Sequence, residues 1–277
     1  MRCNDIEKQL ELFIPKRATA VEKENTGLIV GRSDKNVSTI VVAYRVDQET
    51  IDYAISEQAD MIIVREPIIN EPLLTIGSDS YQGRLLLQLL RHDIACYATG
   101  SSFEQCKGGT ADWIASKLDL SGIYIIEPKA VYTGVNGQSC QSGTGRIGYY
   151  KKKKTLDEIV KRACDEFSLE AVRAYILKEK DELAFSDVAV IVWADEMNMD
   201  AAMERGVQLI VTCGVSCRDA MKVCSEHRAV IELSGETAEG IFTDCVEQYL
   251  SDILSSSIEI LTVPTRRKCR FLTPGKE

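Results

Sequence analysis

Residues 38–67 read STIVVAYRVDQETIDYAISEQADMIIVREP, and this stretch decides the fold class. Residues 38–44 are β-branched and apolar, which is typical of a buried strand. Residues 47–58 carry apolar side chains at helical spacing, and residues 61–64 form a second apolar run that Pro67 ends. A strand, a helix and a further strand in this order predict a parallel pair of strands joined by a helical crossover.

The same alternation continues on both sides of a turn-rich segment at residues 133–148, which we interpret as a hairpin or linker. The sequence therefore predicts an α/β fold with largely parallel strands, and its 277 residues suffice for two domains. The further predicted helices span residues 4–12, 81–91, 110–118, 155–167, 218–226 and 237–255, with another near residue 201; the further predicted strands span residues 94–98, 122–127, 171–177, 188–193, 208–211, 229–233 and 258–263.

Composition excludes several classes of protein. The net charge of −9 argues against non-specific binding to nucleic acid. The basic run at residues 151–154 is either a solvated loop or helix entrance, or a patch that binds phosphate or RNA. No apolar run reaches the ~18 residues of a membrane span, and the first residues lack the apolar core of an export signal. We therefore expect a cytoplasmic protein whose ten cysteines are reduced.

Histidine is scarce, and the cysteines that come closest to a cluster lack the spacing of a metal site. The only histidines, His92 and His227, lie beside arginines at the ends of predicted helices, so histidine-based catalysis has little material. Cys213, Cys217 and Cys224 match no zinc-binding spacing, and we expect them to be buried thiols on a helix face.

Three segments at the carboxyl ends of predicted strands have the composition of a binding site. They are residues 64–67, 99–104 and 234–239. Ligands of α/β sheets bind beyond the carboxyl ends of strands. Each segment offers a glutamate and no histidine, so a metal bound there would be held by oxygen. The alternative is that these segments are ordinary turns and helix caps.

Residues 143–148 spell Gly-Thr-Gly-Arg-Ile-Gly, which matches the glycine pattern of dinucleotide-binding loops. That pattern requires a strand before it and a helix opening on it. Here a polar segment precedes it, and four lysines come before the next helix cap at Thr155. We therefore interpret it as a glycine-rich turn that leads into a strand.

Several motifs, taken in order, resemble the Nif-three-like family, also known as GTP cyclohydrolase I type 2 homologues. The matching segments span nearly the whole chain: residues 24–31 (ENTGLIVG), 62–69 (IIVREPII), 98–104 (ATGSSFE) with 108–113 (GGTADW), 143–148 (GTGRIG), 209–212 (LIVT) and 230–239 (VIELSGETAE).

The resemblance implies two interleaved α/β domains with mixed, largely parallel sheets. The first would span residues 1–130 and be completed by residues 235–277, and the second would span residues 131–234. It further implies a site for two metal ions between the domains, assembly into a homohexameric ring, and hydrolase-like chemistry on a nucleotide or related small molecule.

The departures from the family pattern fall on the implied metal site. Arg65 and Glu66 stand where the family has two adjacent histidines, and Gly100, Gly235 and Arg218 stand where it has three more. In the same segments, Glu104 replaces an aspartate and Glu239 matches the family glutamate.

Two functional hypotheses follow. In the first, Glu66, Glu104 and Glu239 hold a hard cation such as Mg²⁺, Mn²⁺ or Ca²⁺, and a bound water attacks a phosphorylated or heterocyclic substrate. Zinc and iron would need nitrogen or sulfur donors. In the second, the protein is a non-catalytic ring that binds a small anion or a protein. The residues expected to contact an anion are then Arg65, Ser101 and Arg218, because a fixed guanidinium can replace a metal ion's charge.

Overall fold

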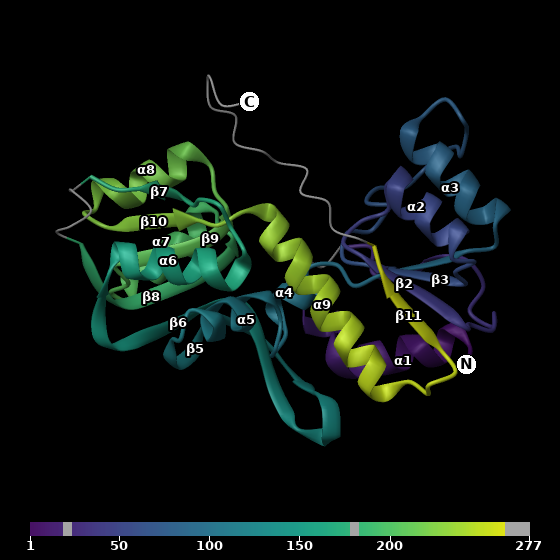
Figure 1. Cartoon of the computed structure of the whole chain (residues 1–277), viewed down its shortest axis with the longest axis horizontal. Helices are drawn as coiled ribbons and strands as arrows, with labels where there is room; N and C mark the ends of the chain where they lie inside the picture. Colours follow the sequence, from purple (N-terminus) through teal and green to yellow (C-terminus); the bar gives the residue numbers. More distant parts are fainter. Residues whose placement is uncertain (19–23, 178–182, 264–277) are drawn as a thin grey trace.

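The computed structural model describes residues 1–18, 24–177 and 183–263, and it has two mixed β-sheets with helices on their faces (Figure 1). The first sheet has the strand order β1-β4-β3-β2-β11, in which β1 is antiparallel to β4 and the remaining neighbours are parallel. Its strands are β1 (Gly27–Val30), β2 (Thr39–Ala43), β3 (Met61–Val64), β4 (Ala95–Ala98) and β11 (Glu259–Thr262). The predicted α/β class is confirmed.

The second sheet has the order β5-β6-β8-β9-β10-β7. Only the pairs β8–β9 and β9–β10 are parallel among the described residues, so this sheet is more antiparallel than the alternation of strands and helices predicts. Its strands are β5 (Ser121–Thr133), β6 (Ser139–Thr155), β7 (Arg173–Tyr175), β8 (Ala184–Trp193), β9 (Leu209–Gly214) and β10 (Ala229–Glu232). Strands β5 and β6 form a long antiparallel hairpin, which confirms the interpretation of residues 133–148 as part of a hairpin.

Helices separate and cover the sheets, which gives alternating layers. Helices α2 (Gln48–Ser56) and α3 (Tyr81–Arg91) pack on the outer face of the first sheet, and α7 (Glu196–Glu204) and α8 (Cys217–Ser225) pack on the outer face of the second. The other helices contribute to the core between the sheets: α1 (Cys3–Phe13), α4 (Ser102–Gln105), α5 (Thr110–Lys117), α6 (Leu156–Phe167) and α9 (Gly235–Ile253), with short 3₁₀ turns at η1 (Lys16–Ala18) and η2 (Val135–Gly137). None of the described helices is both long and apolar enough to cross a membrane.

Strand β2 shows why the parallel strands are apolar throughout. Ile40 and Val42 belong to the core between the sheets, whereas Val41 and Ala43 face α2 and α3 on the other side. Successive side chains of a strand point to opposite faces, so a strand with helices on both faces must be apolar at every position.

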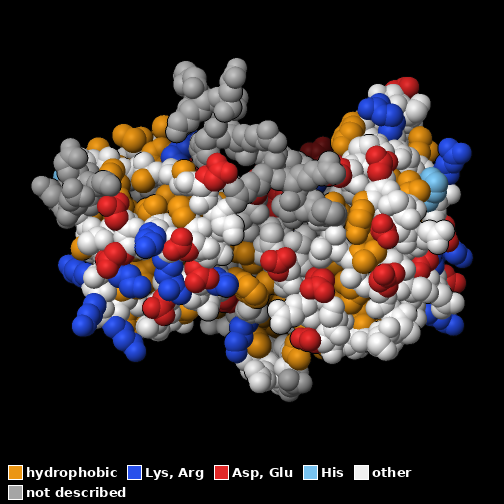
Figure 2. All heavy atoms as spheres, viewed as in Figure 1, with side chains coloured by type: hydrophobic (Ala, Val, Ile, Leu, Met, Phe, Trp, Pro, Cys, Tyr) orange, Lys and Arg blue, Asp and Glu red, His pale blue; other side chains and the backbone are white. Residues whose placement is uncertain are grey.

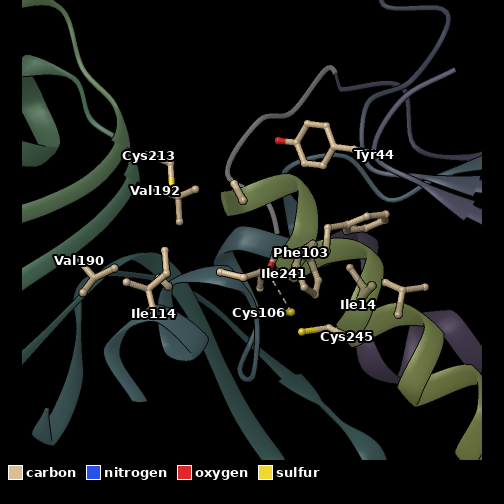
Figure 3. Packing of buried hydrophobic residues seen from close by; sticks show 14 of the residues in the cluster. Ile14, Tyr44, Phe103, Cys106, Ile114, Val190, Val192, Cys213, Ile241 and Cys245 are labelled. Carbon is tan, nitrogen blue, oxygen red and sulfur yellow. Dashed lines mark hydrogen bonds between the residues drawn. The ribbon is translucent and has the colours of Figure 1, made fainter. Parts of the chain in front are cut away.

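The core between the sheets is continuous (Figure 3). Val190, Val192 and Cys213 come from the second sheet, and Phe103 and Ile241 lie between them and Tyr44 of the first. The rings of Phe103 and Phe242 meet edge to face at 5.1 Å, and Phe242 meets Tyr44 in the same way at 6.0 Å. Such pairs stabilise by about 0.5–1.5 kcal/mol beyond the area they bury. They fix the ends of β2 and of α4 relative to α9.

Several local predictions are confirmed. Thr155 and Glu158 form the capping box at the start of α6: the Thr155 hydroxyl accepts from the Glu158 N–H, and the Glu158 carboxylate accepts from the Thr155 N–H at 2.7 Å. His92 and His227 are exposed residues that follow the last turns of α3 and α8.

Other local predictions are wrong. The residue types and spacing of Asn4 and Glu7 predict a cap for the first helix, but α1 begins at Cys3 and has Arg2 as its N-cap. The predicted helix start at residue 237 would place Glu239 in the first turn, but α9 begins at Gly235, so Glu239 lies beyond that turn. Of the three cysteines predicted to be buried on a helix face, Cys213 is a buried strand residue, Cys217 is exposed, and Cys224 alone fits the prediction.

The basic and glycine-rich segments are both parts of β6. Residues 151–154 extend the strand rather than forming a loop or helix entrance, and most of their side chains are exposed. On the face that Figure 2 shows, Lys and Arg side chains gather over the half of the molecule that holds the second sheet. Residues 143–148 also lie within the strand, and Gly145 has a φ of +60°. No helix opens on them, so the requirement of a dinucleotide-binding loop is not met.

Candidate functional site

The candidate site lies at the carboxyl ends of β2, β3 and β4, which are neighbours in the first sheet. Backbone hydrogen bonds continue past the strands and hold the three ends together. The N–H groups of Arg65 and Glu66 both donate to the Tyr44 carbonyl, at 3.0 and 2.9 Å, and the Gly100 N–H donates to the Arg65 carbonyl at 2.9 Å. The side chains that follow the three strands are therefore fixed on one edge of the sheet.

Two arginines organise the acidic side chains of this edge. Arg65 donates from Nε to Oε1 of Glu104 at 2.6 Å. Arg45 donates from Nε to Oε2 of Glu66 at 3.0 Å and from Nη2 to Oε1 of Glu239 at 2.7 Å. Each of the three glutamates that the sequence singles out thus accepts a charge-assisted hydrogen bond from a guanidinium.

Both guanidiniums are held in their charged form. Burial opposes the charge of Arg45, but the hydrogen bonds that Arg45 donates to Glu66 and Glu239 outweigh it and raise the pKa of Arg45 above its usual value. Burial likewise opposes the charge of Arg65, and the charge of Glu104 outweighs it and raises the pKa of Arg65. These two positive charges are consequently permanent features of the site.

Tyr44 lies between the two ion pairs. The guanidinium carbons of Arg45 and Arg65 lie 5.1 and 5.9 Å from the centre of its ring. Its hydroxyl is buried and has no hydrogen-bond partner among the described residues. Burial, with the negative charge of Glu104 as the next cause, raises the pKa of Tyr44 well above its usual value, so the phenol stays protonated.

A fourth carboxylate, Glu24, reaches the same edge from the segment before β1. Its Oε2 accepts from the Ser101 N–H at 2.8 Å and from the Ser101 hydroxyl at 2.6 Å. Gly100 makes room for this contact: its φ is +60°, and a Cβ there would lie 2.5 Å from Thr26 and 2.6 Å from the Glu24 carboxyl carbon. A larger residue at position 100 would require Glu24 or Thr26 to move.

Two clefts open at the site, and Arg65 lines both. The larger has a volume of about 380 Å³ and is polar, and the smaller has a volume of about 190 Å³ and extends toward the second sheet. The larger is lined by Glu24, Arg45, Val46, Arg65, Glu66, Pro67 and Asn70; the smaller is lined by Arg65, Ser101, Glu104, Gln105, Thr144, Gly145, Ile191, Val192, Trp193 and Asp195.

The structure brings most of the predicted site residues together, but not Arg218. Arg65, Glu66, Ser101 and Glu104 line the clefts, and Glu239 is joined to them through Arg45. The Arg218 side chain is 87% exposed, pairs with the neighbouring Asp219 at 3.2 Å, and lines neither cleft.

Sequence reasoning did not single out Arg45 or Glu24. Arg45 follows β2 by two residues, so the carboxyl-end argument applied to β3 would have found it.

The comparisons with known proteins agree on the family. The model of the Duf34/NIF3 family (NGG1p interacting factor 3) matches residues 1–268. The chain belongs to the DUF34/NIF3 family. A GTP cyclohydrolase 1 type 2 homologue of Streptococcus pneumoniae is 24% identical over 252 residues, which cover 91% of each chain.

Solved structures show the same fold. A Staphylococcus aureus hypothetical protein superimposes with a TM-score of 0.83 at 18% identity, and the match covers 98% of this chain and 99% of the other. A Bacillus cereus protein related to NIF3 gives the same score at 17% identity, with the same coverage. The resemblance that the sequence motifs indicate is therefore confirmed at the level of family and fold.

The family resemblance implies a pair of metal ions, and the donor set of this DUF34/NIF3 member does not fit them as arranged. Glu66, Glu104 and Glu239 each face a guanidinium at hydrogen-bond distance, and a metal ion at those oxygens would meet a fixed positive charge. Within the described part of the chain, no three His, Cys, Asp or Glu side chains are grouped so as to hold a metal.

Proposed function

We propose that this DUF34/NIF3 protein is a non-catalytic binding protein in which Arg45 and Arg65 supply the positive charge of the implied metal pair. The observation that carries the proposal is the pairing of Glu66, Glu104 and Glu239 with these two guanidiniums. A guanidinium can neutralise carboxylates but cannot activate a water as a Lewis acid does. The site is therefore suited to binding rather than to hydrolysis.

A small anion is the ligand that Arg65 is best placed to receive. Only its Nε is used by Glu104, and neither terminal nitrogen has a hydrogen-bond partner among the described residues. Because Arg65 lines both clefts, we expect these two nitrogens to be accessible to a ligand there. Two parallel N–H donors match the two oxygens of a carboxylate or phosphate. Ser101 also lines the smaller cleft, where its hydroxyl donates to Glu24 at 2.6 Å.

Charge limits which anions can bind. The site has five carboxylates and two guanidiniums, so its formal charge has a surplus of three negative charges; the carboxylates are those of Glu24, Glu66, Glu104, Asp195 and Glu239. A ligand with one negative charge gains hydrogen bonds from Arg65 at a modest cost in repulsion, whereas a polyphosphate would be repelled by the surplus carboxylates. We therefore expect a monoanion.

A titration with acetate, followed by heteronuclear NMR of the arginine side chains, tests the proposal. We expect acetate to shift the Arg65 resonances, and Arg65→Lys, which keeps the charge but loses the paired donors, to weaken binding by about tenfold, since a hydrogen bond to a charged group contributes about 1.5–3 kcal/mol. Arg173→Lys is the matched control, because Arg173 is 62% exposed and forms a surface ion pair with Glu232. Acetate that binds equally well to all three proteins would overturn the proposal.

The second candidate is a hydrolase that uses a hard divalent cation held by glutamates. Two observations favour it: the surplus of carboxylates over guanidiniums at the site, and the second oxygen of Glu104, which is buried without a hydrogen-bond partner among the described residues. It requires Arg45 and Arg65 to turn away from their carboxylates. Near-stoichiometric Mg²⁺, Mn²⁺ or Ca²⁺ in protein purified without chelator, lost in Glu104→Ala, would favour this candidate over the binding protein.

We further propose that the chain acts as a homo-oligomer, with the hexameric ring that the family resemblance implies. A ring would present several copies of the site together, and such multivalency suits a protein that binds a partner or a metabolite without converting it.

A further inference from the structure

We propose that the ligand of the smaller cleft is a planar aromatic monoanion whose ring stacks on Trp193 while its charged group binds Arg65. This inference rests on the anion-binding function proposed above and specifies the chemical class of the ligand. Its starting point is a large aromatic side chain that is 41% exposed at the wall of a cleft.

Trp193 is held in place by the ends of three elements. It is the last residue of β8 and is paired with Gly214 of β9. A Cβ on Gly214 would lie 2.9 Å from the ring carbons Cε3 and Cζ3, and a Cβ on Gly235, at the start of α9, would lie 3.5 Å from Cη2. Neither glycine has the positive φ that would require glycine for backbone reasons. Because these glycines have no side chains, the indole ring can pack closely against their backbone.

The Trp193 ring therefore packs against Gly214 and Gly235, and it also forms part of the wall of the smaller cleft. Burying a tryptophan completely would be favourable, so its partial exposure at a cleft marks a surface available to a ligand. The cleft volume of about 190 Å³ suits a single aromatic ring, given that a cavity of about 150 Å³ can hold benzene.

The remaining cleft residues define the charge of the ligand. Arg65 is its only cationic lining residue, and Glu104 already balances that charge. Asp195 also lines the cleft, and its carboxylate accepts from the Asn198 N–H at 2.9 Å as the cap of α7. One carboxylate on the ligand can use both terminal nitrogens of Arg65, whereas a second negative charge would face Glu104 and Asp195 without a cation.

The test compares benzoate with cyclohexanecarboxylate, which have the same charge and similar size but differ in aromaticity. The protein is labelled with 5-fluorotryptophan, so that its two tryptophans, Trp113 and Trp193, give two fluorine resonances. We expect benzoate to shift the Trp193 resonance and leave that of Trp113 unchanged. We also expect it to bind about threefold to tenfold more tightly than cyclohexanecarboxylate, because an aromatic pair gains energy beyond the area buried.

Two variants isolate the ring contact. Trp193→Leu should remove the preference for benzoate while changing cyclohexanecarboxylate affinity by less than about twofold, and Trp193→Phe should keep part of the preference. If Trp193→Leu does not fold, the ratio of the benzoate and cyclohexanecarboxylate affinities in the unmodified protein and in Trp193→Phe still tests the stacking proposal.

The two proposals fail in different ways. Equal affinities for the two carboxylates, or a benzoate shift at Trp113 alone, overturn the stacking proposal and leave the anion site of Arg65 intact. If neither carboxylate binds, or if Arg65→Lys leaves both affinities unchanged, the anion-binding function itself falls, and the ligand class falls with it.

Discussion

The arginine in the glycine-rich stretch of β6, Arg146, has a structural role. Its side chain is buried, with Nε donating to Oδ1 of Asp112 at 2.6 Å and Nη2 donating to Oδ2 at 3.0 Å. Its terminal nitrogens also donate to the backbone carbonyls of Gly143, Gly145 and Cys106. One guanidinium thus joins β6 to the start of α5 and the end of α4. At this residue the sequence motif has a structural role.

Arg146→Lys should lower the free energy of unfolding by about 3–5 kcal/mol, because one ammonium cannot replace the paired contacts and leaves Asp112 and several carbonyls without donors. Denaturant unfolding measures the change. The same substitution at the exposed Arg173 should cost less than about 1 kcal/mol. Equal effects at the two positions would show that Arg146 does not hold these elements together.

At the scale of elements, the turn between β4 and α4 controls the site. Gly100→Ala should be destabilising, because a left-handed conformation costs a non-glycine residue about 1–2 kcal/mol, and the new methyl group would also push Glu24 away from Ser101. Gly206→Ala is the matched control: its φ is +81°, but a Cβ there meets nothing within 4 Å. The larger loss of unfolding free energy should occur at Gly100, and a larger loss at Gly206 would contradict the crowding at the site.

The parallel strands could be predicted from sequence because helices on both faces make them apolar at every position, as in β2 and β3. Strand β7 was predicted about twice as long as it is, because apolar residues around 171–177 carry no information about where pairing with β10 ends. The antiparallel pairs of the second sheet escaped prediction for a similar reason, since pairing direction depends on tertiary contacts.

The site could be predicted only in part. The strand-end rule identifies the segments of Glu66 and Glu104, and the structure places both at the clefts. Which cation faces each glutamate could not be predicted, because Arg45 and Glu239 are 194 residues apart and meet only when α9 packs against the end of β2. Arg218 was proposed from motif alignment alone, and alignment does not tell which way an exposed helix-start side chain points.

At the scale of the whole molecule, apolar side chains are exposed away from the clefts. Val131 on the β5–β6 hairpin is 71% exposed, and Leu74, before α3, is 99% exposed. The hairpin extends beyond the body of the second sheet in Figure 1, so Val131 is accessible to another chain. Exposed apolar groups on a projecting element are a common feature of surfaces that bind other proteins. They give the proposed ring a place to form contacts.

Light scattering tests the assembly. A homohexamer should have about six times the 30.8 kDa mass of one chain. If the hairpin forms the contact, Val131→Lys should shift the population toward smaller species, because a lysine charge would have to be desolvated at the interface. Leu74→Lys, in the segment before α3, serves as the comparison. If Leu74→Lys lowers the mass and Val131→Lys does not, the contact belongs to the surface before α3. A monomer mass for the unmodified chain would rule out the ring and would leave the arginine site to act in a single subunit.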